Sequence, residues 1–220
     1  GQDALALHWQ KKAAAAQAAG YFNQEIEPII HRDRKNQQKV LAEDEYLRKD
    51  ATIESLGKLR PAFQKNGTVT AGNASGINDG AAALVLMSKS EAEAKGVPYL
   101  ATIKGYAETG IDPAIMGYAP YYAIKQVLSK TGLLADDIDL FELNEAFASQ
   151  SIAVIRDLGL PEEKINISGG AIALGHPIGA SGSRILVTLL HALERTDTKL
   201  GLASLCIGGG MGIAMIVERP

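Results

Sequence analysis

The sequence has very little cysteine, no excess of charge of one sign and no long apolar run. Its single cysteine, Cys206, excludes an internal disulfide and a metal site with four cysteine ligands. The longest apolar runs, such as ILVTLL, are far too short to span a bilayer. The first residues show no charged and then apolar leader with a small-residue cleavage site. We therefore expect a reducing, cytoplasmic location and no membrane.

The charges are nearly balanced. The 22 basic and 25 acidic residues give a formal net charge of -3, which gives no electrostatic reason to expect nucleic acid or an anionic membrane as a partner. The 220 residues are 46% hydrophobic and 21% charged, as is usual for a globular protein with a real core. The chain has no initiator methionine and its first residues already read as a helix, so we expect the later portion of a longer chain.

From about residue 100 the sequence alternates regularly between strand and helix patterns. The expected strands cover residues 101–110, 138–144, 165–168, 201–209 and 212–220, and the expected helices cover residues 121–132, 145–159 and 179–196. The order β-α-β-α-β-α-β-β predicts an α/β layered domain with a largely parallel sheet, in which the last two strands form an antiparallel pair.

The first hundred residues are less regular. Residues 1–22 predict a helix that stops at Gly20. Residues 25–63 are rich in charge and poorly periodic, so we expect an irregular surface segment with a short helix near residues 52–59. A loop rich in glycine, asparagine and serine follows, and it leads into a short expected strand, residues 82–87.

The stretch GGAIALGHPIGASG, residues 169–182, surrounds His176 with five glycines. Their positions do not match the Walker, the Rossmann or the nucleophile-elbow pattern. His176 and His191 also lie too far apart in the sequence for the usual spacing of zinc ligands. Dinucleotide and metal binding are therefore disfavoured.

Glycines let the main chain approach a ligand closely, and Pro177 fixes the turn directly after the histidine. We interpret the loop as one that holds the imidazole of His176 beside an open space. The alternative is a structural histidine that caps the loop by bonding backbone carbonyl groups.

Two further polar loops follow predicted strands. Three glycines come directly after Cys206, and their backbone N–H groups could stabilise an oxyanion, although a lone cysteine on an apolar strand can be an inert core residue. Asn144 and Glu145 lie where a strand gives way to a helix, so Asn144 could equally be a helix cap. All three loops are expected at the carboxyl ends of strands, where sites form in α/β sheets.

The motifs NEAFA, GGAIALGHPIGASG and CIGGGMG, in this order and spacing, resemble the C-terminal signature motifs of thiolases. The stretch GTVTAGNASGINDGAAALVLMS resembles the segment by which a thiolase chain re-enters its first core half. The resemblance covers essentially the whole chain and implies a thiolase-like layered α/β fold with a mixed five-stranded sheet. It also implies three parts: residues 1–66 end the loop domain that covers coenzyme A, residues 67–98 complete the N-terminal half and residues 99–220 form the C-terminal half.

Thiolases make or break a carbon–carbon bond between acyl thioesters of coenzyme A, in a reversible condensation or thiolysis of 3-ketoacyl-CoA and acetyl-CoA. The resemblance implies that Cys206 is the acid/base that removes the α-proton of acetyl-CoA. It implies that His176 activates the nucleophilic cysteine and contributes to the oxyanion hole. Asn144 would position a water in that hole, and the backbone N–H of Gly208 would donate to the oxyanion of the acyl-enzyme.

The resemblance also implies contacts with coenzyme A and with the acyl group. Residues of the loop domain would meet the nucleotide and pantetheine portions, and others would form the pantetheine tunnel or line the acyl pocket. These residues are Arg48, Ser55, Phe63, Ser75, Met116 and Phe147. Close to Met116 the sequence departs from the family pattern, because Tyr121 and Tyr122 stand where a proline is common. We expect this departure to affect the local turn and the acyl-chain preference.

The nucleophilic cysteine of the family belongs to the N-terminal half, upstream of residue 1, and Cys206 is the only cysteine present. We therefore expect that half as a partner, acetyl-CoA and 3-ketoacyl-CoA as substrates, and neither a metal nor another cofactor. The resemblance further implies a homodimer or homotetramer and a role in fatty acid metabolism. Two alternatives remain: a non-catalytic thiolase-like module that binds acyl-CoA or lipid, and a condensing enzyme for carrier-protein thioesters, which usually has a histidine where Cys206 stands.

Overall fold

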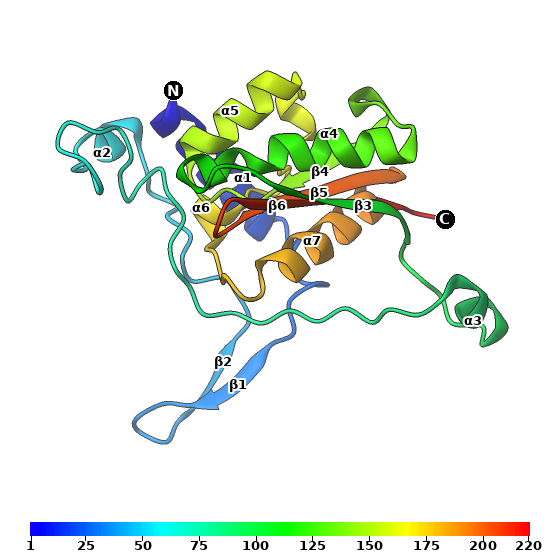
Figure 1. Cartoon of the computed structure of the whole chain (residues 1–220). Helices are drawn as coiled ribbons and strands as arrows, with labels where there is room; N and C mark the ends of the chain where they lie inside the picture. The colour runs from blue at the N-terminus through cyan, green and yellow to red at the C-terminus, as the bar shows by residue number, and fades with distance from the viewer.

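The computed structural model describes residues 1–220, and at its centre lies a four-stranded sheet (Figure 1). The strands lie in the order β3 (Thr102–Gly110), β6 (Met211–Glu218), β5 (Leu200–Ile207) and β4 (Leu140–Leu143). Only β4 and β5 pair in parallel, whereas β3 with β6 and β5 with β6 are antiparallel. The mixed α/β fold and the final antiparallel pair are confirmed, but the expectation of a largely parallel sheet is wrong.

The sheet has one strand fewer than expected. Residues 165–168 form no strand, and only an isolated parallel bridge joins Ile165 to Phe141. Asn166 has a φ of 44°, so the backbone leaves the extended conformation directly after Ile165. The side chain of Asn166 instead accepts from the N–H of Leu143 and donates to its carbonyl, at 2.8 Å each. This side chain therefore supplies the hydrogen bonds that a fifth strand would have given to the backbone of Leu143.

Helices cover both faces of the sheet. Helices α4 (Ala119–Thr131) and α5 (Ala148–Leu158) lie on one side, and α7 (Ser181–Thr196) lies on the other (Figure 1). α4 ends at Gly132 and α5 at Gly159, both in the left-handed conformation that suits a helix stop. The three helices predicted here are confirmed, although α5 begins at Ala148 and not at Glu145.

The remaining elements frame this layered region. α1 (Gln2–Ala18), which ends before Gly20 as predicted, packs against α5 and against the short α6 (Ala171–Leu174). The short helix expected near residues 52–59 is confirmed as α2 (Ile53–Gly57). The other short elements are α3 (Lys89–Ala94) and the 3-10 turns η1 (Pro113–Tyr118), η2 (Ala135–Asp137) and η3 (Glu162–Lys164).

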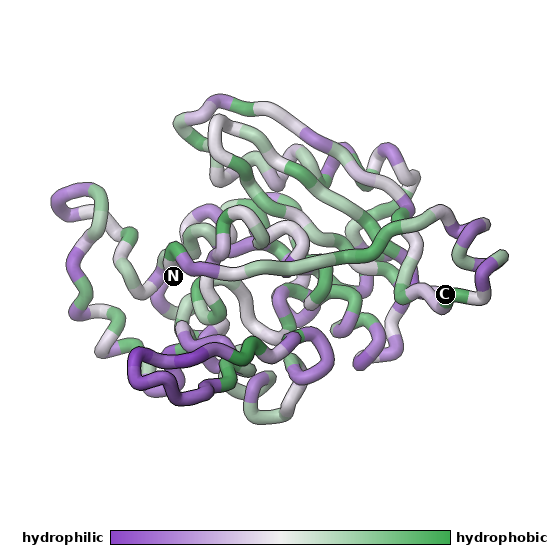
Figure 2. Tube along the Cα trace, turned by 90° about the horizontal axis from the view of Figure 1, so that it is seen from below, coloured by the Kyte–Doolittle hydropathy of each residue, from purple (hydrophilic) through white to green (hydrophobic).

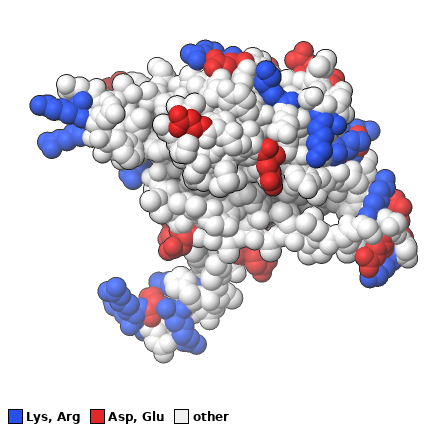
Figure 3. All heavy atoms as spheres, in the orientation of Figure 1, with Lys and Arg blue, Asp and Glu red and all other residues white.

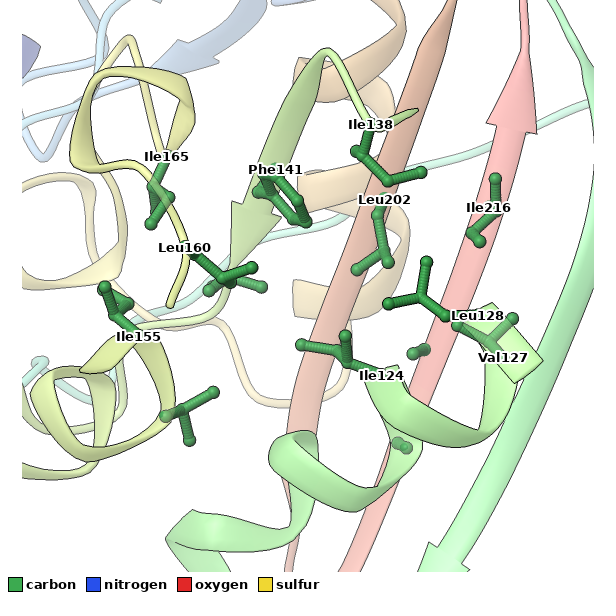
Figure 4. Close-up of a cluster of buried hydrophobic side chains, with 14 of the residues drawn as sticks. Ile124, Val127, Leu128, Ile138, Phe141, Ile155, Leu160, Ile165, Leu202 and Ile216 are labelled. Carbon is green, nitrogen blue, oxygen red and sulfur yellow. The ribbon is translucent and has the colours of Figure 1, made fainter. Parts of the chain in front are cut away.

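The sheet separates two layers of apolar side chains. Figure 4 shows the larger layer, in which Phe141, Leu202 and Ile216 of the strands face Ile124 and Val127 of α4. The second layer joins the opposite face of the sheet to the leucines of α7. Removing these side chains from water supplies the main free energy that holds the helices to the sheet.

Residues 29–41 form a hairpin that the sequence did not predict. Its strands β1 (Ile29–Arg32) and β2 (Gln38–Leu41) are antiparallel. Asp33 accepts from two backbone N–H groups of the turn, and Asn36 adopts a φ of 61°, so the turn is closed by local polar contacts. The hairpin projects from the body (Figure 1), is strongly hydrophilic (Figure 2) and carries Lys and Arg at its tip (Figure 3).

The strand expected at residues 82–87 is not formed. These residues belong to a long segment that runs along the outside of the molecule without pairing (Figure 1). Val85 and Leu86 are 89% and 73% exposed. A strand needs a neighbour for its backbone hydrogen bonds, and none of the 220 residues supplies one. The segment therefore has the composition of a strand but no sheet to join.

None of the helices combines the length and the hydrophobicity that crossing a membrane requires. The division of the chain into residues 1–66, 67–98 and 99–220 stays a prediction.

Candidate active site

Two of the predicted site residues lie at one edge of the sheet. Asn144 directly follows β4, and its backbone N–H donates to the carbonyl of Ser204 in β5 at 2.9 Å. Cys206 lies two residues further along β5. Because β4 and β5 are parallel, Asn144 and Cys206 both lie at the carboxyl ends of their strands, as predicted.

His176 reaches Asn144 from the loop between α6 and α7, so the expectation that this loop follows a strand is wrong. Asn144 Nδ2 and His176 Nε2 are 3.3 Å apart, which is within hydrogen-bond distance. Asn144 is 2% exposed, and its Oδ1 is buried without a hydrogen-bond partner in the chain. The alternative of Asn144 as a helix cap is wrong, because α5 begins only after Phe147.

The backbone of His176 is anchored to a segment far away in the sequence. Its N–H donates to Asn78 Oδ1 at 3.1 Å, and its carbonyl accepts from the N–H of Asn78 at 3.4 Å. Gly175 has a φ of 102°, and a Cβ there would lie 2.7 Å from the Asn78 side chain. The glycine directly before the histidine is therefore required for this anchor. The sequence shows Asn78 only as part of a turn-forming stretch, with no sign of its partner.

The ring of His176 contacts two side chains and no backbone carbonyl. Nδ1 lies 2.5 Å from Ser181 Oγ, while Nε2 faces Asn144. The alternative of a histidine that bonds backbone carbonyl groups is therefore wrong. Burial, followed by the positive charge of Arg184, lowers the pKa of His176, so the ring is neutral near pH 7.

Cys206 is 8% exposed and forms no disulfide. Burial raises the pKa of its thiol, and a backbone hydrogen bond opposes this rise only in part, so the thiol holds its proton near pH 7. Gly208, Gly209 and Gly210 form the turn that follows, and the last two have φ values of 91° and 87°. A Cβ built at Gly208 would meet no atom within 4 Å, so the space beside this residue is open.

Glu145 has a role in the loop that its sequence position alone did not reveal. Its carboxylate is fully buried and accepts from Asn166 Nδ2 and from the N–H of Ile172. A Cβ at Gly170 would collide with this carboxylate, so the glycine allows the close approach. Burial raises the pKa of Glu145 to about 7, against the effect of both hydrogen bonds. Glu145 thus holds the segment that leads to His176.

Three of the predicted coenzyme A contacts lie together. The rings of Phe63 and Phe147 meet edge to face with their centroids 5.9 Å apart. The backbone N–H and the hydroxyl of Ser75 both donate to the carbonyl of Ala146, at 3.0 and 3.2 Å. Phe63 is 72% exposed, so the aromatic pair presents an open face next to the segment that follows Asn144.

Arg48 and Ser55 form no hydrogen bond with these three residues. The guanidinium of Arg48 is exposed, with its Cζ 5.7 Å from the centroid of the Tyr46 ring. The hydroxyl of Ser55 takes part in the capping box of α2, where it donates to the carbonyl of Thr52 at 2.8 Å. The structure brings neither residue into contact with His176 or Cys206.

Met116 lies in η1, which packs against α5. Directly after it, the departure from the family pattern builds an aromatic cluster. The Tyr118 and Tyr121 rings stack with their centroids 4.9 Å apart, and Tyr122 meets Tyr121 edge to face at 5.1 Å. Pro120 falls in the first turn of α4, where a proline is tolerated, so the helix forms despite the altered sequence.

Comparisons with known proteins cover the whole chain. The model of the thiolase C-terminal domain matches residues 97–219, and that of the thiolase N-terminal domain matches residues 1–90. The chain is 57% identical over 219 residues to an acetyl-CoA acetyltransferase of Chromobacterium violaceum, and 60% identical over 218 residues to one of Escherichia coli strain K12. These alignments cover 100% and 99% of this chain, but only 56% and 55% of the two relatives.

Solved structures agree with these matches. The acetyl-CoA acetyltransferase of Bacillus anthracis superposes with a TM-score of 0.97 at 48% identity, and human mitochondrial 3-ketoacyl-CoA thiolase in complex with CoA with a TM-score of 0.91 at 45% identity. Both matches cover 100% of this chain and 55% and 54% of the solved chains, so the chain spans about half the length of the proteins that it resembles. Sequence, fold and both domain models lead to one conclusion: the chain belongs to the thiolase family.

Proposed function

We propose that this chain supplies one half of the active site of an acyl-CoA C-acyltransferase, an enzyme that condenses or cleaves acyl thioesters of coenzyme A. The observation that carries the proposal is the contact of Asn144 with His176, at the same sheet edge as Cys206. The relatives named acetyl-CoA acetyltransferase, and the thiolase solved with CoA, support acetyl-CoA and 3-ketoacyl-CoA as the substrates.

The proposed partner is the N-terminal thiolase half, which brings the nucleophilic cysteine. Two observations support this partner. Residues 82–87 have the composition of a strand but no sheet to join, and the relatives extend over about twice the length of this chain. Val85 and Leu86, which are exposed here, would then become buried.

In the first half-reaction the nucleophilic thiol gives its proton to Nε2 of His176, which is neutral and able to accept it. The resulting thiolate forms a bond to the thioester carbon, and the carbon–sulfur bond to CoA breaks. The departing CoA thiolate takes the proton of Cys206, whose raised pKa keeps a proton available near pH 7. Cys206 is left as a thiolate.

In the second half-reaction the Cys206 thiolate removes the α-proton of acetyl-CoA. The enolate carbon forms the new carbon–carbon bond to the acyl group, and the nucleophilic cysteine leaves and recovers its proton from His176. Negative charge on the enolate oxygen needs hydrogen-bond donors that point at this oxygen. Each such donor commonly stabilises the transition state by about 3 kcal/mol. The protonated Nε2 of His176 is one such donor. The buried, unpaired Oδ1 of Asn144 supports a role in holding a water as another.

The aromatic pair Phe63 and Phe147, together with Ser75, would flank the pantetheine arm, and Arg48 and Ser55 would meet more distant parts of coenzyme A. Met116 would line the acyl pocket, and the N–H of Gly208 would donate to the oxyanion of the acyl-enzyme. The proposed chemistry uses no further cofactor. A homodimeric or homotetrameric assembly, a cytoplasmic location and a role in fatty acid metabolism complete the proposal.

The test uses a two-half protein, in which this chain is fused behind the part of the Escherichia coli relative that it does not match. After mixing with acetyl-CoA, we expect mass spectrometry to find one acetyl group on a cysteine of the N-terminal half. Cys206→Ala should reduce condensation by about a thousandfold, because the acid/base is lost. Ser151→Ala removes a buried hydroxyl that forms no hydrogen bond with His176 or Cys206 and should leave the rate within about twofold.

A folded fusion that gains no transferable acetyl group, and whose Cys206→Ala variant behaves like the parent, would contradict the proposal. Binding of acyl-CoA without transfer would then favour the thiolase-like binding module.

A further inference from the structure

Ser181 is the first residue of α7 and is completely buried. Its hydroxyl lies between two groups of the histidine loop, with Oγ 2.5 Å from His176 Nδ1 and 3.0 Å from the carbonyl oxygen of Pro177. A carbonyl oxygen can only accept a hydrogen bond, so the contact with Pro177 uses the one hydrogen of the hydroxyl. The same carbonyl also accepts from the backbone N–H groups of Ala180 at 2.7 Å and Ser181 at 2.8 Å. The oxygen of Ser181 is then available to His176 only as an acceptor.

An accepting Ser181 requires a proton on Nδ1 of His176. The ring is neutral, since burial and Arg184 lower its pKa, so Nε2 then carries the lone pair. Nε2 faces Nδ2 of Asn144, which can only donate, at 3.3 Å. Both neighbours of the ring thus favour the same tautomer.

The opposite tautomer would lose the contact of Nε2 with Asn144 and the bond from the Ser181 hydroxyl to Pro177. A proton on Nε2 would point at the amide hydrogens of Asn144. The hydroxyl of Ser181 would have to turn away from Pro177 to donate to Nδ1. Arg184, the charged group that acts on the ring from α7, forms no hydrogen bond with either ring nitrogen. The ring nitrogens contact Ser181 and Asn144, so these two side chains set the tautomer by hydrogen bonding.

We propose that Ser181 is a positioning residue that holds His176 in the Nδ1–H tautomer, through the chain of contacts from Pro177 to Ser181 to His176. This inference rests on the proposed function, in which the lone pair of Nε2 exchanges its contact with Nδ2 of Asn144 for the proton of the nucleophilic thiol. After that transfer Nδ1–H still donates to Ser181, and the new Nε2–H can donate to a thioester oxygen. A single ring nitrogen then serves first as base and afterwards as oxyanion donor.

The matched control for Ser181→Ala is Ser151→Ala. Ser151 is 2% exposed and, like Ser181, donates to the carbonyl four residues earlier, that of Phe147, at 3.1 Å. Removing either hydroxyl therefore deletes a buried oxygen and the same kind of backbone contact. Only Ser181 contacts a histidine ring.

The first measurement is made on the two-half protein labelled with ¹⁵N-histidine. Long-range ¹H–¹⁵N spectra identify the protonated nitrogen of His176, with His176→Gln used to assign the signals. We expect Nδ1–H in the parent and in Ser151→Ala, and a mixture of tautomers in Ser181→Ala. The His176 pKa should also fall in Ser181→Ala, because the imidazolium loses an acceptor. Nε2–H in the parent would overturn the proposal.

The second measurement is steady-state kinetics. Ser181→Ala should lower kcat about tenfold with KM for acetyl-CoA nearly unchanged, and Ser181→Thr, which keeps the hydroxyl, should recover part of the loss. Equal kcat values for Ser181→Ala and Ser151→Ala would overturn the proposal. If the parent fusion lacks transferase activity altogether, the proposed function fails, while the spectra still decide which tautomer Ser181 selects.

Discussion

Residues 99–220 and residues 1–98 differ in how far they find their packing partners within this chain. The first region contains the sheet, both layers of its covering helices and most of the buried side chains. The second region has one well-packed helix, α1, and otherwise consists of a projecting hairpin, short helices and an unpaired extended segment (Figure 1). The comparison teaches that composition alone does not make an element, because a strand or a helix also needs a neighbour.

The largest effect is expected from Phe141→Ala in the layered region. Phe141 is 1% exposed, and its removal should lower the free energy of unfolding of the two-half protein by about 3 to 5 kcal/mol. The matched variant Ile30→Ala lies in the hairpin, where the side chain is 66% exposed. This variant should change the free energy of unfolding by less than about 0.5 kcal/mol. Urea unfolding followed by circular dichroism measures both. Similar losses at the two positions would remove the contrast between the regions.

A smaller effect, dependent on pH, is expected at Glu142. Burial raises the pKa of Glu142 from 4.5 to about 8, so between these values the folded protein holds a proton that the unfolded chain has released. The free energy of unfolding should therefore fall as the pH rises from about 4.5 to about 8. Glu142→Gln should reduce this fall and make the protein more stable by about 2 kcal/mol at pH 8, with little change at pH 4.

The control for this experiment is Glu163→Gln, an exposed position in η3. Thermal melts between pH 4 and pH 8 should show the same pH dependence for this variant as for the parent. If Glu142→Gln also follows the parent at every pH, then the buried carboxyl does not cause the fall.

The smallest effect is expected from Val85→Lys in the 220-residue chain. The side chain is 89% exposed and contacts no sheet, so the free energy of unfolding should change by less than about 0.5 kcal/mol. The same change in the two-half protein should lower the free energy of unfolding strongly, because residue 85 would be buried against the neighbouring half. A large loss in the chain alone would show that the segment already has a partner within it.

Much of the layered region could be predicted from the sequence. Gly132 and Gly159 marked the ends of α4 and α5, and the regular apolar spacing placed α7 and the last two strands. The expected strand at 165–168 failed for a local reason, since Asn166 adopts a left-handed conformation that no periodicity of apolar residues reveals. The hairpin was missed because its strands are exposed on both faces and therefore show no alternation.

The candidate site was only partly predictable, and for a different reason. Residues placed by the family resemblance, such as Asn144 and His176, do meet in space. Their supporting contacts, to Asn78 and Ser181, depend on backbone geometry that the folded chain creates. A serine early in a helix and an asparagine in a turn are too common in sequences to indicate such a role on their own.

The anchor between Asn78 and His176 ties the most chemically important ring to the more loosely held end of the molecule. A local loosening around residue 78 would let the imidazole drift while the sheet and its helices keep their shape. Mild denaturant should then reduce the activity of the two-half protein at concentrations well below those that unfold it.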